Sequence, residues 1–419
     1  MTPRAQLVSR RSFVAGAAAA AADCGLLPGA RAQTASDGFR ELRARPLGAG
    51  HEAQSATSLL GFDGAVPGPI LRVKRGDELR VRLVNELAEP SSVHWHGIRL
   101  PNAMDGVPAL TQPPVAPGAR FEYRFRPPDA GTFWYHAPGG HQLEQGLYGA
   151  LIVEEAEPVR VDRDIVLVLG TAGPLGGGLP PVRVNGLSRP DIPVTSGERL
   201  RLRLVNATAA RGLAVKIEGH AVWVMAIDGQ PAEPAMARDT RFGLGPGNRI
   251  DLFVDMLLDP GSLAPLVAVG SNEPIARLVY AGDAAPRAAP RSDPGALPPN
   301  PLPARMDLRS SLKLEMNLAS AKALHPADPP MFAVKRGRAV TLTIRNTSGR
   351  PHVVHLHGHS FRLLDRLDDG WKPYWLDTLV VGDQVERIAF VADNPGKWPI
   401  TSRTLEQPGS DAGVWFSVA

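Results

Sequence analysis

The chain repeats itself three times, and this repeat restricts the possible folds more than any other feature of the sequence. In each copy a short apolar segment leads to a glycine, an alternating apolar and polar run follows, and an asparagine comes nine residues after the glycine: Gly76 and Asn85, Gly197 and Asn206, Gly337 and Asn346. Alternation with a period of two is typical of a half-buried β-strand. A repeated pattern indicates copies of one structural unit.

Turns and length agree with a chain of β-domains. Proline and glycine turns bound the strands, as at Pro117-Gly118, and short strands between such turns are typical of β-sandwiches. A length of 419 residues suits two to four domains of roughly 100–200 residues each. We therefore predict an all-β protein of three consecutive Greek-key β-sandwich domains. The predicted divisions are an export segment at 1–32, domains at 33–157, 158–285 and 306–419, and a Pro- and Ala-rich linker at 286–305.

The first 32 residues have the features of an export signal. Arg10 and Arg11 form a twin-arginine pattern, an alanine-rich stretch follows, and Ala30-Arg31-Ala32 fits a cleavage site. We therefore expect a mature chain in a bacterial periplasm. The single cysteine of the chain lies inside this segment, so the mature chain is expected to contain no disulfide and no thiolate ligand.

Charge and motif content argue against several other classes. The chain has 46 basic and 42 acidic residues, a net charge of +4, without a run of Lys or Arg, so nucleic-acid binding is not indicated. Beyond the export segment no apolar run is long enough to span a bilayer. No glycine-rich phosphate loop and no Gly-X-Ser-X-Gly motif occurs in the sequence.

Two His-X-His-Gly segments, one near each end of the mature chain, indicate a metal site. His94 and His96 form one pair, and His355 and His357 form the other. Residues two apart in a strand point to the same face. Neutral imidazole suits copper, zinc, iron and nickel, so two such pairs that converge from different strands predict a metal centre.

The position of the histidines in the repeat predicts which domains share this centre. Nine and eleven residues past the repeat asparagine, the first and third copies carry the two histidine pairs, whereas the middle copy carries Val215 and Ile217. We therefore predict that the middle domain is a spacer and that the site lies between domains one and three.

Together with Trp134-Tyr135-His136 and the run from His352 to His359, these pairs resemble three of the four copper motifs of the multicopper oxidases, the laccase-like family. The resemblance covers nearly the whole mature chain. It implies three cupredoxin domains and a copper cluster between the first and the third. The copper ligands that it implies are His94, His96, His136, His355 and His357 in the cluster, and His352 at a separate type 1 copper.

The chain departs from the family pattern at the remaining ligand positions. Pro138 stands where the second motif has its other histidine, and Thr401-Ser402-Arg403 stands where the fourth has His-Cys-His. A type 1 copper takes two histidines and a thiolate, so Ser402 leaves that site without its main ligand. Arg403 does not lose its proton in proteins and is expected to repel a metal ion. We therefore expect one copper ion, or at most a reduced pair.

Two further residues have more than one interpretation. Asp105 resembles the family's acid near the oxygen channel, which is a proton donor, but an Asp-Gly turn explains it equally well. His141 lies in the loop after Pro138, where it is either a replacement imidazole or a solvated side chain.

Three hypotheses for the function remain open. The first is a periplasmic protein that binds copper ions at the residual site without a laccase cycle. The second is a non-enzymatic periplasmic scaffold with a protein partner, similar to the metal-free cell-division branch of the family, whose histidines bond to one another and to water. The third is a functioning laccase-like oxidoreductase that oxidises phenols or metal ions with oxygen.

Overall fold

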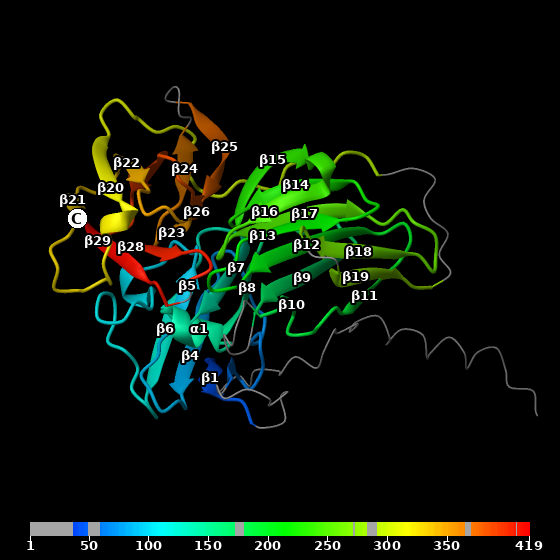
Figure 1. Cartoon of the computed structure of the whole chain (residues 1–419), viewed down its shortest axis with the longest axis horizontal. Helices are drawn as coiled ribbons and strands as arrows, with labels where there is room; N and C mark the ends of the chain where they lie inside the picture. Colours follow the sequence, from blue (N-terminus) through cyan, green and yellow to red (C-terminus); the bar gives the residue numbers. More distant parts are fainter. Residues whose placement is uncertain are drawn as a thin grey trace, which may run out of the picture.

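The computed structural model describes residues 37–48, 59–171, 180–270, 273–282, 291–364, 370–407 and 409–419. The predicted export segment and residues 286–290 of the predicted linker lie outside this part. The described residues form six β-sheets, two for each copy of the repeat, which appear in Figure 1 in blue to cyan, in green, and in yellow to red. The prediction of three β-sandwiches is confirmed. No helix in the described part of the chain is long and apolar enough to cross a membrane.

The first sandwich has two four-stranded sheets, whose strands are named in their spatial order. One sheet is β2 (Leu60–Phe62), β1 (Arg40–Pro46), β4 (Leu79–Asn85) and β6 (Arg120–Phe125). The other is β3 (Leu71–Lys74), β8 (Tyr148–Glu154), β7 (Gly131–His136) and β5 (His94–His96). Two short helices accompany them, η1 (Asn102–Met104) and α1 (Gly140–Glu144).

The second sandwich has a six-stranded and a five-stranded sheet. The first is β10 (Arg183–Val184), β9 (Arg163–Gly170), β12 (Arg199–Asn206), β17 (Arg249–Asp255), β14 (Val222–Ile227) and β15 (Gln230–Met236). The second is β11 (Asp191–Val194), β19 (Pro274–Tyr280), β18 (Leu263–Ala268), β13 (Leu213–Ile217) and β16 (Arg241–Leu244), with the short helix η2 (Arg238–Thr240) before β16.

The third sandwich has two five-stranded sheets. One is β20 (Leu312–Asn317), β22 (Arg338–Arg345), β27 (Glu386–Ala392), β24 (Phe361–Leu364) and β25 (Trp371–Leu376). The other is β21 (Phe332–Val334), β29 (Ala412–Val418), β28 (Gly396–Thr404), β23 (His352–Leu356) and β26 (Thr378–Val381), and the short helix η3 (Leu318–Ser320) follows β20.

The repeat asparagines have the same structural role in all three sandwiches. The side-chain amide of Asn85 donates to the carbonyls of Glu89 and Val115, and Asn206 and Asn346 make the corresponding pairs of bonds in their own domains. Each therefore ties the loop after its strand to a neighbouring segment. A buried amide needs such partners, because an unpaired polar group in a core destabilises the fold. This explains the regular spacing in the sequence.

The first and third sandwiches share one continuous hydrophobic core, whereas the second has a core of its own. The shared core includes Trp95 and Tyr135 from the first sandwich and Leu356, Trp398 and Phe416 from the third. In Figure 1, β5 and β7 meet β23 and β28 near the centre of the molecule. This shared boundary positions the site.

Candidate metal centre

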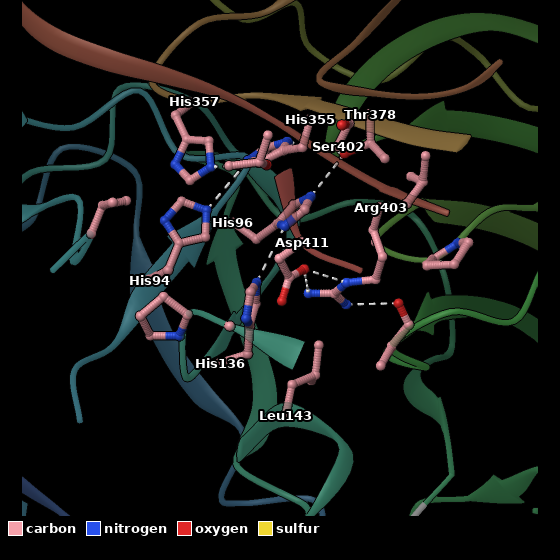
Figure 2. A pocket seen from close by; sticks show the side chains of 18 of the residues that line it. His94, His96, His136, Leu143, His355, His357, Thr378, Ser402, Arg403 and Asp411 are labelled. Atoms are coloured by element: carbon pink, nitrogen blue, oxygen red, sulfur yellow. Dashed lines mark hydrogen bonds and ion pairs between the residues drawn. The ribbon is translucent and has the colours of Figure 1, made fainter. Parts of the chain in front are cut away.

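Five of the six predicted imidazole ligands lie together at the boundary between the first and third sandwiches. His94 and His96 come from β5, His136 ends β7 opposite His94 in the strand register, His355 lies in β23, and His357 follows that strand. All five are buried and line a cavity of about 380 Å³, shown in Figure 2. None of these clustered imidazoles comes from the middle sandwich.

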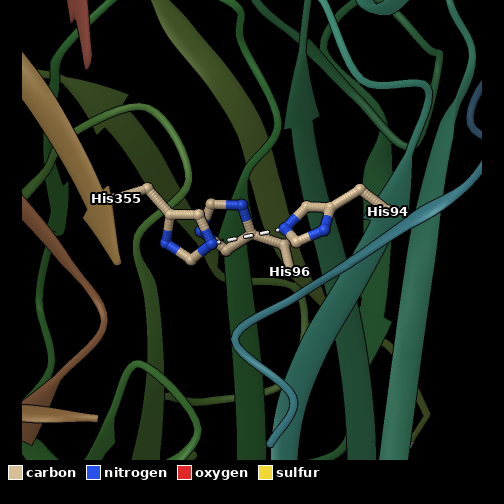
Figure 3. Close-up of side chains that lie close together, drawn as sticks. All are labelled: His94, His96 and His355. Carbon is tan, nitrogen blue, oxygen red and sulfur yellow. Dashed lines mark hydrogen bonds between the residues drawn. The ribbon is translucent and has the colours of Figure 1, made fainter. Parts of the chain in front are cut away.

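The nitrogens of His94 and His355 face each other across the domain boundary, as Figure 3 shows. Their Nε2 atoms are 3.3 Å apart. The Nδ1 atom of His94 donates to the Asp105 carbonyl at 2.8 Å, and that of His355 to the Asp377 carbonyl at 3.0 Å. In the neutral form an imidazole has one N–H, so when both rings are neutral their Nε2 atoms present lone pairs to each other.

His96 and His136 form a second facing pair. The Thr378 hydroxyl donates to Asp377 Oδ1, so it accepts from Nε2 of His96, 2.8 Å away. Nδ1 of His136 donates to the Ala137 carbonyl at 2.9 Å. The remaining nitrogens, Nδ1 of His96 and Nε2 of His136, lie 3.4 Å apart with their lone pairs directed at each other.

A metal ion relieves both lone-pair contacts better than a proton does. Burial lowers the pKa of His96 and His136 well below its usual value, and it also lowers the pKa of His355. Protonation therefore costs free energy in this cavity. Ligand atoms of His94, His96 and His355 all lie within 4.8 Å of one another, which places three imidazoles around one candidate metal position. The donor set is all imidazole, which suits copper.

His357 has a hydrogen-bond partner near each ring nitrogen, and with His94 and Asp105 it also forms a second group of ligand atoms within 4.8 Å of one another. Its Nδ1 donates to Asp105 Oδ2 at 3.0 Å, and its Nε2 lies 3.4 Å from the Thr401 hydroxyl. Burial raises the pKa of Asp105, but His357 and His94 lower it further, to a net value well below the usual range. Asp105 is therefore an ionised acceptor in this state; its role as a proton donor stays a prediction.

The three replaced cluster positions line the same cavity. Pro138, Thr401 and Arg403 all contribute to its wall. Nε of Arg403 donates to Asp411 Oδ1 at 2.6 Å, and one Nη donates to the Ala209 carbonyl at 2.7 Å. Figure 2 shows the guanidinium of Arg403 paired with Asp411, which is an exposed residue of the cavity lining.

The place of the type 1 copper holds donors that do not fit that ion. His352 is separate from the cluster, and its Nε2 lies 3.0 Å from the Ser348 hydroxyl. Its Nδ1 and the Ser402 hydroxyl are both buried without a hydrogen-bond partner among the residues described. A hydroxyl is not a thiolate, so these residues do not provide a type 1 ligand set. His141 is exposed on α1 and does not line the cavity.

Supporting residues that the sequence did not reveal surround the imidazoles. Arg249, from the middle sandwich, binds both carboxylate oxygens of Asp377 at 2.9 and 2.6 Å. Gly97 adjoins this pair, and Thr378 contacts His96 and His355. The spacer prediction is therefore incomplete: the middle sandwich supplies no clustered imidazole, but it braces the segment that holds them. No local pattern marks contacts between residues so far apart in the chain.

Comparison with known proteins agrees with this geometry. Models of the family described as multicopper oxidase match residues 45–158, 117–267 and 298–418. Multicopper oxidase MmcO of Mycobacterium tuberculosis is 29% identical over 411 residues, 81% of this chain and 79% of MmcO. A copper resistance protein A homolog of Pseudomonas syringae pv. tomato is 42% identical over 117 residues, 27% of this chain and 20% of that protein.

A solved structure extends the similarity to the whole fold. The multi-copper oxidase from Pseudomonas thermotolerans superposes with a TM-score of 0.81 at 33% identity, covering 91% of this chain and 99% of that one. The prediction of three cupredoxin-like domains is thereby confirmed. The chain belongs to the multicopper oxidase family.

Proposed function

We propose that this protein is a copper-binding member of its family that holds one or two ions and does not carry out laccase-type turnover. The two facing imidazole pairs support this most directly. His94 with His355, and His96 with His136, each direct two lone pairs into a space where burial disfavours a proton. Copper suits both pairs, and we expect no third ion because Pro138, Thr401 and Arg403 replace three ligands of the family cluster.

The two histidine pairs would hold copper, but the chain has no type 1 copper site through which electrons from a distant substrate could reach it. Copper supplies a one-electron redox centre when bound. Thr378 and the Asp377 carbonyl fix the ring orientations of His96 and His355, as outer partners of metal-bound histidines do. Without a thiolate at position 402, substrate electrons have no type 1 copper to enter through. Four-electron reduction of oxygen is therefore expected to be absent.

Copper sequestration in the periplasm is the role that this arrangement suits best. The cavity extends from buried imidazoles to exposed residues at its edge, including Gly139, Ala323 and Asp411, so copper has a path from solvent. The similarity to proteins named for copper resistance favours the same role.

We also propose twin-arginine export. Replacing Arg10 and Arg11 by lysine is expected to keep the protein out of the periplasmic fraction, and unchanged export would contradict this.

The decisive test of the proposed function removes one imidazole from each side of the domain boundary. His94→Ala combined with His355→Ala is expected to lower copper content to half that of the unaltered protein or below. His220→Gln is the matched control, because this histidine is also buried but pairs with Tyr280 in the middle sandwich. Undiminished copper in the double variant, with normal folding by circular dichroism, would overturn the proposal.

A further inference from the structure

One dipeptide of the third sandwich contacts a histidine of each facing pair. The Thr378 hydroxyl accepts from His96, and the Asp377 carbonyl accepts from His355. These bonds determine which nitrogen of each ring carries the proton, and therefore which nitrogen directs its lone pair at the partner ring. The conformation of the Asp377-Thr378 backbone thus sets the direction of two of the four lone pairs.

A carboxylate of the middle sandwich holds this backbone. Oδ2 of Asp228 accepts from the backbone N–H groups of both Asp377 and Thr378, each at 3.3 Å. Asn248 completes the clamp: its amide donates to Asp228 at 3.1 Å and to the Thr378 carbonyl at 3.0 Å. Asp228 also accepts from the backbone N–H of Arg249 at 3.0 Å, so its own position is fixed within the middle sandwich.

We propose that Asp228 is a positioning residue for the copper centre, which acts through the backbone of Asp377 and Thr378 on the orientation of His96 and His355. The inference rests on the proposed copper site. It gives the middle sandwich a direct part in building a centre whose imidazoles all come from the other two.

The surroundings of Asp228 indicate that the negative charge of this side chain costs stability. It is wholly buried beside a second carboxylate, Asp377, and the guanidinium of Arg249 faces both. Burial and the Asp377 charge raise the pKa of Asp228 to about 7, although Arg249 and the N–H donors act in the opposite direction. A residue with only a packing role would be more stable as a neutral side chain.

The test compares Asp228→Asn with a matched change in the same sandwich. An asparagine keeps the volume of the side chain, but it has only one acceptor oxygen. Its NH2 group must therefore face donors, either the backbone N–H groups of Asp377 and Thr378 or the Asn248 side-chain amide and the Arg249 backbone N–H. Asp251→Asn is the control, because Asp251 is equally buried and bonds to Arg201, Arg203 and Thr132 instead. We expect Asp228→Asn to weaken copper binding by roughly 10- to 100-fold and to change the copper EPR parameters. Asp251→Asn is expected to change thermal stability without changing either.

Two further measurements keep the inference separable from the proposed function. If Asp228→Asn does not fold, Asn248→Ser, which loosens the same clamp, replaces it. If the unaltered protein binds no copper, the proposed function fails, and ¹⁵N chemical shifts of the His96 and His355 rings then decide the positioning role. A tautomer change in Asp228→Asn but not in Asp251→Asn supports it. Unchanged EPR parameters and affinity, or unchanged tautomers in the copper-free case, overturn it.

Discussion

At the scale of the single residue, Gly97 occupies a position beside the site that has no room for a side chain. Gly97 closes the first His-X-His-Gly segment with a φ of +85°. A Cβ placed there would lie 2.5 Å from the Asp377 carboxylate and would also collide with the Arg249 guanidinium. The glycine of the motif is therefore required by close approach of the Asp377–Arg249 pair, in addition to its backbone conformation.

Gly97→Ala tests this steric requirement against a glycine of similar conformation. Gly76 has a φ of +88°, and in the described part of the chain no atom beyond its two chain neighbours lies within 4 Å of the position that a Cβ would take there. Gly76→Ala should therefore cost only the conformational strain of about 1–2 kcal/mol. Gly97→Ala should cost about 2–3 kcal/mol more, because the collision is with buried charged groups. Urea unfolding of both variants measures the difference, and equal losses would show that the close approach is unimportant.

His359 predicts how stability depends on pH. Its ring packs against Phe390, Trp398 and Phe416, and burial lowers its pKa to about 4. The unfolded chain, with an ordinary histidine pKa of about 6.5, takes up the proton first as the pH falls. The contribution of neutral His359 to the free energy of unfolding is therefore present above about pH 6.5 and is lost progressively towards pH 4.

His359→Phe should reduce this acid sensitivity. The free energy of unfolding of the copper-free protein is measured at pH 7 and at pH 4.5. The unaltered protein is expected to lose about 2 kcal/mol more than the variant over this interval. The other buried histidines contribute equally to both proteins, so the comparison isolates His359. An identical loss in the two proteins would contradict the argument.

At the scale of elements, β28 and the loop after it connect the three sandwiches through hydrogen bonds. Arg403 donates to the Ala209 carbonyl of the second sandwich, and the next residues add a bond from Glu406 N–H to the Ala210 carbonyl at 2.8 Å. Asp411, which holds Arg403, accepts from Gly140 N–H of the first sandwich at 2.6 Å. A segment that the family resemblance assigns to copper ligands therefore carries an ion pair whose two side chains each hydrogen-bond to another sandwich.

Arg403→Gln is expected to loosen this tie. The free energy of unfolding should fall by about 1–2 kcal/mol. Solvent screening keeps this loss small, because the Asp411 side chain is 39% exposed. Arg277→Gln breaks a pair of similar geometry with Asp191 on the surface and should leave the unfolding free energy nearly unchanged. Guanidinium chloride unfolding compares the two variants, and equal effects would argue against an interdomain role for Arg403.

At the scale of the whole molecule, the sequence reveals repeated local patterns and misses contacts between distant segments. The spacing from glycine to asparagine predicts three sandwiches, because in each copy the buried asparagine amide makes the same kind of hydrogen bond to a backbone carbonyl. The alternation of His94 and His96 likewise predicts a shared face. The clamp of Asp228 on Thr378 could not be predicted, because it joins residues 150 positions apart and leaves no periodic signal.

The side-chain partners of the residues at the replaced ligand positions could not be predicted from the sequence either. The sequence shows that Thr401 and Arg403 stand at family ligand positions, but not where their side chains go. Thr401 turns to His357, and Arg403 turns to Asp411, because each polar group needs a partner inside a partly buried cavity. Both partners belong to the third sandwich itself, but they lie 44 and 8 positions away along the chain, so no local sequence pattern identifies them.

The copper content of the mature protein tests the central claim most directly. The protein is purified without an affinity tag from copper-supplemented cells, and metal analysis is combined with absorption and EPR spectra. We predict about one to two copper ions per chain, an EPR signal from imidazole-bound copper and no intense blue charge-transfer band, because no thiolate is present. Copper-free protein, or three or more ions with a blue band, would contradict the account.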